Sequence, residues 1–216
     1  QLYTCPHCAG EVNFTEEALD EASYRVKDVF PCPHCGAELS KPKLERLYVT
    51  QFDPSSKKNI QVPKRHPVLI SYTIGKIRYE KKPSAEDFAV LNRISAMPLP
   101  PQVPTGELPP MHMTHERARM DYAGITHVHH FYLPRAAQAM GALWARARAH
   151  PEPRLRAFLL FMVEQAIWGL SVLNRYGPTH FSQVNRILTG VYYVASQHAE
   201  CSPWYNLDGK VDRLPK

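Results

Sequence analysis

Two Cys-Pro-His-Cys blocks, Cys5–Cys8 and Cys32–Cys35, carry the clearest chemistry in the sequence, and 23 residues separate them. Two cysteines spaced by two residues can hold one ion from a tight turn, and a second such pair completes a tetrahedral shell. Gly10 and Gly36 suit these turns, because glycine tolerates the backbone angles that bring amides toward sulfur. Two disulfides or four unconnected thiols are the alternatives. We predict a structural zinc site formed by Cys5, Cys8, Cys32 and Cys35.

A second group of possible ligands is rich in histidine. Five of the eleven histidines lie between residues 111 and 135, with two acids nearby: His112, His115, His127, His129 and His130, with Glu116 and Asp121. On a strand, His127 and His129 would face the same way and could share a zinc or manganese ion for hydrolysis. The same side chains equally suit contacts to phosphates or to another domain. An independent metal-dependent hydrolase using the His112–His130 cluster therefore stays an alternative.

Other catalytic patterns are missing from the sequence. It contains neither Gly-x-Gly nor Gly-x-Ser-x-Gly, which excludes dinucleotide and P-loop fingerprints and the hydrolase elbow.

Cys201 has no partner cysteine, and four ligand-like cysteines with one odd thiol indicate a reducing cytoplasm. No apolar run approaches the length of a membrane span, and the first 20 residues do not resemble a signal peptide. Because the chain starts at Gln1 instead of Met, we expect a piece of a longer protein.

Positive charge is concentrated in one stretch. The net charge is +6, yet residues 57–82 hold eight basic side chains against the single acid Glu80, so the remainder is close to neutral. A concentrated basic patch is typical of a surface that binds a polyanion, most often nucleic acid. A solubilising sheet face is the alternative.

The sequence pattern around these groups predicts an α+β fold, in which secondary-structure elements position the candidate residues. We expect an N-terminal four-cysteine zinc ribbon with a small β region, followed by a mainly helical domain. Alternating or β-branched runs predict strands, and apolar stripes at helical spacing predict helices. We expect strands at 47–52, 67–74, 76–81 and 187–195, and helices at 85–95, 135–149 and 154–176, the last buried as a hub. Domain boundaries are predicted as 1–50, 51–96, 97–133 (a Pro-rich strap and His-rich segment) and 134–216.

Three motifs together carry a family resemblance. The segment Gly124–Arg135 (GITHVHHFYLPR), the double Cys-Pro-His-Cys ribbon and Pro67–Tyr72 (PVLISY) resemble an insert of bacterial and phage DNA methyltransferases. These enzymes are of the N4-cytosine/N6-adenine type, in a group of adenine-specific methylases with a zinc ribbon. The resemblance covers about residues 1–200. The family's Phe-x-Gly-x-Gly and Asp/Asn-Pro-Pro-Tyr motifs are absent here, so the resemblance implies the target-recognition region without its catalytic halves.

This resemblance implies a DNA-binding role for a bacterial or phage-encoded cytoplasmic protein. The expected partners are double-stranded DNA and the catalytic methyltransferase domain of the same parent chain, with no membrane; S-adenosylmethionine would bind only in the parent enzyme. A zinc-ribbon adaptor that binds other proteins is a further alternative. The expected DNA contacts are Lys57, Lys58, Lys64, Arg65, Lys76, Arg78 and Lys82 for phosphates, and His127, His129, His130, Arg135, Asn174, Arg175, Asn185 and Arg186 for reading or orienting bases.

Overall fold

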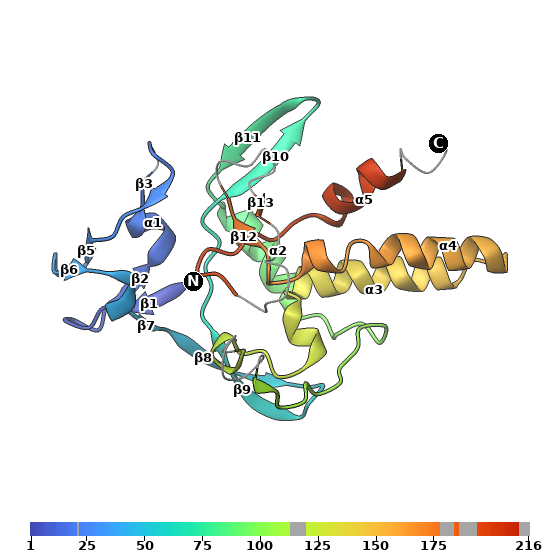
Figure 1. Ribbon diagram of the computed structural model, residues 1–216, viewed down its shortest axis with the longest axis horizontal. Helices are drawn as coiled ribbons and strands as arrows, with labels where there is room; N and C mark the ends of the chain where they lie inside the picture. The colour runs from blue at the N-terminus through green and yellow to red at the C-terminus, as the bar shows by residue number, and fades with distance from the viewer. Residues whose placement is uncertain (21, 113–119, 178–183, 186–193, 212–216) are drawn as a thin grey trace. The chain divides into compact units, whose positions relative to one another are not determined.

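A computed structural model describes residues 1–20, 22–112, 120–177, 184–185 and 194–211 (Figure 1). In these ranges the chain is mixed α and β, with five α-helices and small antiparallel sheets. It divides into two compact units, which are described separately below. Unit 1 comprises Gln1–Gln51 and Asn59–Arg93, and unit 2 comprises Phe52–Lys58 and Ile94–Lys216. Among the helices that the structure describes, none is long and apolar enough to cross a bilayer.

The ribbon at the start of unit 1 is built from very short strands around one small core. A three-stranded antiparallel sheet has the order β2-β1-β7, and two further pairs, β3–β4 and β5–β6, complete the ribbon. The elements are β1 (Leu2–Thr4), β2 (Glu11–Asn13), α1 (Phe14–Ala18), β3 (Leu19–Asp20), β4 (Arg25–Val26), β5 (Phe30–Pro31), β6 (Glu38–Leu39) and β7 (Glu45–Arg46). Phe14 lies at the centre of the core, between the rings of Tyr3 and Phe30.

The remainder of unit 1 contains a β-hairpin and a helix. The hairpin pairs β10 (Ile70–Ile74) with β11 (Ile77–Lys81) around Gly75, whose φ of 60° suits a tight turn. Helix α2 (Ala85–Ser95) has the predicted bounds. At its N-terminus the amide and hydroxyl of Ser84 both donate to Asp87 Oδ2, at 2.8 and 2.9 Å. Strands β8 (Tyr48–Asp53) and β9 (Lys58–Pro63) form a two-stranded sheet, and their connecting turn is grouped with unit 2.

Unit 2 is mainly helical. Helices α3 (Pro134–Arg148) and α4 (Pro153–Glu164) lie side by side (Figure 1). Helix α5 (Pro203–Val211) contacts both and contributes Leu207 to their core. Alanines on α3 allow this close packing, and the common core holds eight buried residues: Ala136, Met140, Ala147, Val163, Ala166, Leu170, Cys201 and Leu207. The Cys201 thiol is thus a core group, as expected for a bystander. Strands β12 (Arg175–Tyr176) and β13 (Val184–Asn185) pair nearby.

The predicted helix over 154–176 is wrong in its length and in its burial. Helix α4 ends at Glu164, and the 3-10 helix η5 (Trp168–Leu170) follows. Within η5, a Cβ on Gly169 would lie 1.8 Å from Asn206 Oδ1, so this backbone approaches α5 closely. The buried hub is instead the segment Leu170–Leu173, whereas much of the apolar surface of α4 is exposed. Most of the strand predicted over 187–195 lies outside the described residues.

Candidate metal centres and the basic surface

The two Cys-Pro-His-Cys blocks form matching turns. In each turn the amide of the histidine donates to the first cysteine's sulfur at 3.4 Å, from His7 to Cys5 and from His34 to Cys32. The chain then reverses through a residue of positive φ, Ala9 at 58° or Gly36 at 73°. The same backbone geometry therefore occurs twice, once with the residue type that tolerates it and once with alanine.

The four thiols converge on one point between these turns. Cys5 Sγ lies 3.9 Å from Cys35 Sγ, and Cys8 Sγ lies 3.8 Å from Cys32 Sγ. Disulfide sulfurs are about 2.05 Å apart, so these pairs are not disulfides. A tetrahedron with zinc–sulfur bonds of about 2.3 Å requires sulfurs about 3.8 Å apart, which agrees with the observed spacing. All four ligating atoms lie within 4.8 Å of one another, and the predicted cluster forms a possible zinc site.

The pKa shifts of two thiols in this cluster run in opposite directions, with a thiolate favoured at Cys32. The Gly10 amide lowers the pKa of Cys8, but burial and the side chains of the other three cysteines raise it to about 12. Burial opposes ionisation of Cys32, but the backbone amides of Cys35 and His34 and the neighbouring Cys5 and Cys35 side chains lower its pKa to about 6. Thiolates are the form that binds zinc. A site of four sulfurs is closed, so its contribution is structural.

Gly10 has a different role from the one that its turn position suggested. A Cβ on Gly10 would lie 2.5 Å from Cδ2 of His34 and 3.2 Å from Cys8 Sγ. The His34 ring is held there because its Nε2 lies 2.8 Å from the carbonyl oxygen of Glu11. Gly10 is therefore needed for the close approach of the two turns.

The predicted phosphate contacts of unit 1 are partly engaged within the fold. Lys64 forms an ion pair with Glu11 at 2.5 Å, and Arg78 forms one with Glu80 at 3.3 Å. Arg65 is half-buried, and burial followed by the nearby Arg46 charge lowers its pKa to about 10. Lys76 and Lys82 are exposed. Of this set, Arg65 is the least suited to reach a phosphate.

The β10–β11 hairpin is exposed along nearly its whole length. Tyr72 and Tyr79 lie opposite each other in the register, and their rings stack with centroids 5.6 Å apart. Ile74 and Ile77 flank the turn with 62% and 61% of their surface exposed. Arg78 lies opposite Thr73 on the other face of the ribbon. The hairpin thus has an aromatic and aliphatic face and a polar face, both accessible.

Several of the base-reading candidates in unit 2 are not placed as predicted. Asn174 is 1% exposed and its amide donates to the Gly169 carbonyl at 2.6 Å, so that side chain is a structural group and not a DNA contact. Arg175 is half-buried in β12, and Arg135 pairs with Glu200 at 3.2 Å. Asn185 belongs to β13, and Arg186 lies outside the described residues. Lys57, in the β8–β9 connection, and Lys58, the first residue of β9, are exposed.

The histidines of the Gly124–Arg135 segment are brought together by a turn instead of a strand. Gly124 (φ 71°) ends a 3-10 helix, and His127 then pairs with Glu107 in an isolated antiparallel bridge. The chain next forms the 3-10 helix η4 (Val128–Phe131). The expectation that His127 and His129 share a strand face is therefore wrong, because η4 begins directly after His127.

The acid that completes this group is Asp53, which comes from the end of β8 in the same unit. Its Oδ2 lies 3.2 Å from Nε2 of His129 and 3.4 Å from Nε2 of His130. The sequence indicates only a turn at Asp-Pro-Ser-Ser, and the separation of 76 positions between Asp53 and His129 hides the contact. Asp121 is not part of this group, His112 is exposed, and His115 and Glu116 lie outside the described residues.

Hydrogen bonds from the β8–β9 turn hold the Asp53 carboxylate. Burial would raise the pKa of Asp53, but donors from the Ser56 hydroxyl and the Ser55 amide, with the charge of His129, hold it well below its usual range. For His130, burial and then the neighbouring His129 lower the pKa to about 4, against the opposing effect of Asp53. An ionised carboxylate beside a neutral imidazole is the pairing that a metal ion requires.

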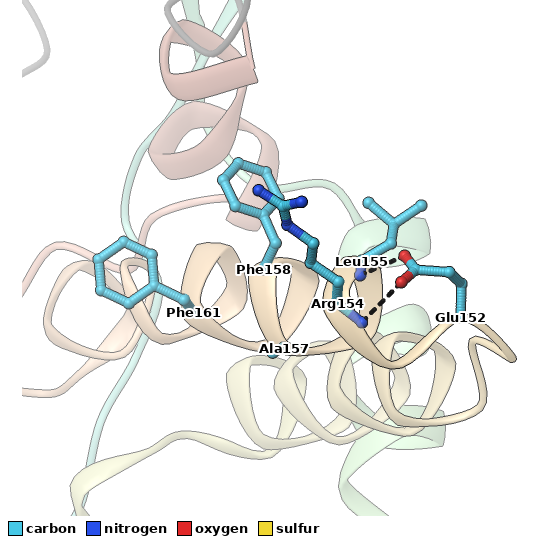
Figure 2. Close-up of a pocket in the computed structure, with 6 residues that line it drawn as sticks. All are labelled: Glu152, Arg154, Leu155, Ala157, Phe158 and Phe161. Atoms are coloured by element: carbon cyan, nitrogen blue, oxygen red, sulfur yellow. Dashed lines mark hydrogen bonds between the residues drawn. The ribbon is translucent and has the colours of Figure 1, made fainter.

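A shallow depression of about 520 Å³ on α4 lacks such chemistry. Leu155, Phe158 and Phe161 line it, together with Glu152, Arg154 and Ala157. Figure 2 shows the Glu152 carboxylate capping the helix through the amides of Arg154 and Leu155, at 2.8 and 2.5 Å. Because the only acid here is used as a helix cap, this surface has no convergent polar groups of the kind that bind a substrate.

Comparisons of the chain with models of protein families, with curated proteins and with solved structures find no match.

Proposed function

We propose that this chain is a DNA-binding region, the target-recognition part of a site-specific DNA methyltransferase of the adenine-N6 type. It would bind duplex DNA and hold one structural zinc ion in the four-cysteine site. The catalytic and S-adenosylmethionine-binding motifs would belong to other parts of the parent protein. The observation that carries this proposal is the exposed, basic β10–β11 hairpin, which belongs to the same unit as the four-cysteine ribbon.

The hairpin has the dimensions and the chemistry of a DNA-reading element. The major groove accommodates a two-stranded β-ribbon. Lys76 and Arg78 would neutralise phosphates, while Tyr72, Tyr79 and the exposed isoleucines at the turn supply surface for bases or sugars. The Arg78–Glu80 pair is no obstacle, because an exposed ion pair is worth only about 0–1 kcal/mol and exchanges readily for a phosphate contact.

The ribbon would depend on its metal ion for rigidity. A core of nine residues, two of them zinc-ligand cysteines, is too small to be stable by burial alone, so metal binding would supply much of the folding free energy. We infer that the zinc stabilises the DNA-binding unit and makes no contact with DNA.

Fluorescence anisotropy with a labelled duplex over a series of salt concentrations tests the DNA-binding role. Each lost phosphate contact lowers the slope of log K against log salt by about 0.9. The double variant Lys76→Ala/Arg78→Ala should therefore lower it by about 1–2. The matched control Arg148→Ala/Arg154→Ala removes the same charge from exposed positions of α3 and α4 and should leave the slope unchanged. No duplex binding at low salt, or equal effects of both variants, would contradict the proposal.

The methyltransferase parentage has a separate test in the flanking genomic sequence. The proposal expects Phe-x-Gly-x-Gly on one side of this region and Asp-Pro-Pro-Tyr on the other. Flanking sequence without these motifs would contradict the parentage while leaving the DNA-binding role to the anisotropy measurement.

A further inference from the structure

We propose a second metal centre in this chain, in which Asp53, His129 and His130 bind one divalent transition-metal ion of the zinc class. Their ligating atoms all lie within 4.8 Å of one another. They come from two distant parts of the sequence, the end of β8 and the 3-10 helix η4, and both parts belong to unit 2. This centre is independent of the four-cysteine site and of the proposed DNA-binding function.

Burial is the first argument for a bound ion. Asp53 and His129 are only 6% and 8% exposed. Buried polar atoms are nearly always hydrogen-bonded or bound to an ion, so these side chains need close partners. Two imidazoles and a carboxylate are costly to bury unless they satisfy one another or share an ion.

The crowding around one oxygen atom is the second argument. Four donors approach Oδ2 of Asp53: the Ser56 hydroxyl at 2.5 Å, the Ser56 amide at 3.2 Å, and the two Nε2 atoms of His129 and His130. A carboxylate oxygen offers about two lone-pair positions, so it cannot serve four donors well. An ion between the three side chains removes this excess, because both Nε2 atoms then direct lone pairs, not protons, toward the centre.

The groups around the three ligands can support this arrangement. Oδ1 of Asp53 accepts from the Ser55 amide at 3.0 Å, which fixes the carboxylate. Without an ion, the Thr126 amide donates to Nδ1 of His130 at 3.2 Å, which places the ring proton on Nε2. When Nε2 binds a metal the proton moves to Nδ1, so the bond from the Thr126 amide is lost and is replaced by one to Thr126 Oγ1, which lies 3.3 Å away and can accept the proton. Such partners orient metal-bound histidines in known sites.

The donor set indicates the kind of ion. Two imidazole nitrogens and one carboxylate oxygen suit zinc and its neighbours better than calcium or magnesium, which prefer oxygen alone. Three protein ligands leave a position of a tetrahedral ion for water or another small ligand, unlike the closed four-sulfur site. The two centres should therefore differ in stoichiometry, in spectrum and in the residues that they need.

Metal analysis of the purified full chain after zinc loading and removal of loosely held ion tests the proposal. Wild-type chain should hold two zinc ions. Asp53→Asn and His129→Gln should each hold one, as should a chain whose four-cysteine site is disabled by Cys32→Ser. The control His150→Gln makes the same type of substitution between α3 and α4 and should retain two.

Cobalt substitution supplies a readout that does not depend on counting ions. The thiolate-to-cobalt charge-transfer band should persist in Asp53→Asn, while the weaker ligand-field absorption of the nitrogen and oxygen site disappears. Asp53→Asn keeps the side chain's shape, and circular dichroism of each variant checks its fold. One zinc per wild-type chain, or two in folded Asp53→Asn and His129→Gln, would overturn the proposal. Two ions without duplex binding would support this centre and contradict the DNA-binding function.

Discussion

The contact between Gly10 and His34 yields the sharpest test of how the ribbon is built. Replacing Gly10 with alanine would place a Cβ 2.5 Å from Cδ2 and 2.9 Å from Cγ of the His34 ring. Real Cβ atoms do not approach so closely, so the ring must move. That movement breaks the contact between His34 Nε2 and the Glu11 carbonyl oxygen, now 2.8 Å long.

The cost of Gly10→Ala follows from these two effects. Overpacking of a close contact costs about 1–3 kcal/mol, and a lost hydrogen bond about 1 kcal/mol. Because relaxation relieves part of the clash, we expect a total of about 2–3 kcal/mol. Folding of the ribbon is coupled to metal binding, so the zinc affinity should fall by about 30- to 150-fold, since 1.4 kcal/mol corresponds to a factor of ten.

Competition for zinc with a coloured chelator measures this loss, and a double-mutant cycle identifies its cause. His34→Ala removes the ring while its backbone amide still donates to Cys32. If the ring causes the cost, the double variant should be more stable than the sum of the single effects by about 1–2 kcal/mol. Gly36→Ala is the control: its Cβ would meet nothing within 4 Å, and its cost comes from a φ of 73° alone. Additive effects of Gly10→Ala and His34→Ala would refute the reasoning.

Two further substitutions test the turn geometry and the exposed helix. Ala9→Gly should stabilise the ribbon by about 1 kcal/mol, because Ala9 has a φ of 58° that glycine adopts without strain. Chelator competition would detect this as a higher zinc affinity, and an unchanged zinc affinity would count against the prediction. Phe161→Ser should change the melting temperature little, because Phe161 is 60% exposed. Leu170→Ala should lower the free energy of unfolding by about 2–5 kcal/mol, because Leu170 is buried. Similar shifts in melting temperature for both variants would instead favour the buried helix predicted over residues 154–176.

Local patterns in the sequence predicted the features that local physics determines. The spacing within each cysteine pair sets a turn, and four thiols from two turns have few arrangements other than a common centre. Helix α2 was predicted with its observed bounds, because its apolar stripe starts just after a capping serine. The end of α4 at Glu164 was missed because the apolar stripe continues past it, and the close approach of Gly169 to Asn206 forms only in the folded chain.

Asp53 shows the same limit at a candidate site. In the sequence it is one acid in an Asp-Pro-Ser-Ser turn, and its carboxylate does bind the turn amides as such a motif predicts. The contact that gives it possible chemistry joins it to histidines more than 70 residues away. The His-x-His-His pattern indicated possible ligands but assigned the acid to Glu116 or Asp121, which are nearer in sequence. The nearest acids in the sequence were therefore the wrong prediction for the acid of this group.

The two centres place different demands on the chain. The thiol cluster is assembled within a ribbon that has little core of its own, so its ion would act on folding and should be difficult to remove without unfolding the ribbon. The Asp53–His129–His130 group lies in a unit with two apolar cores of its own, which among the described residues contain no possible metal ligand set and should form without an ion. Removing a metal there should leave the helices folded and change only the local site. Because the fold does not require this ion, its role would be to bind water or another small ligand at the open coordination position.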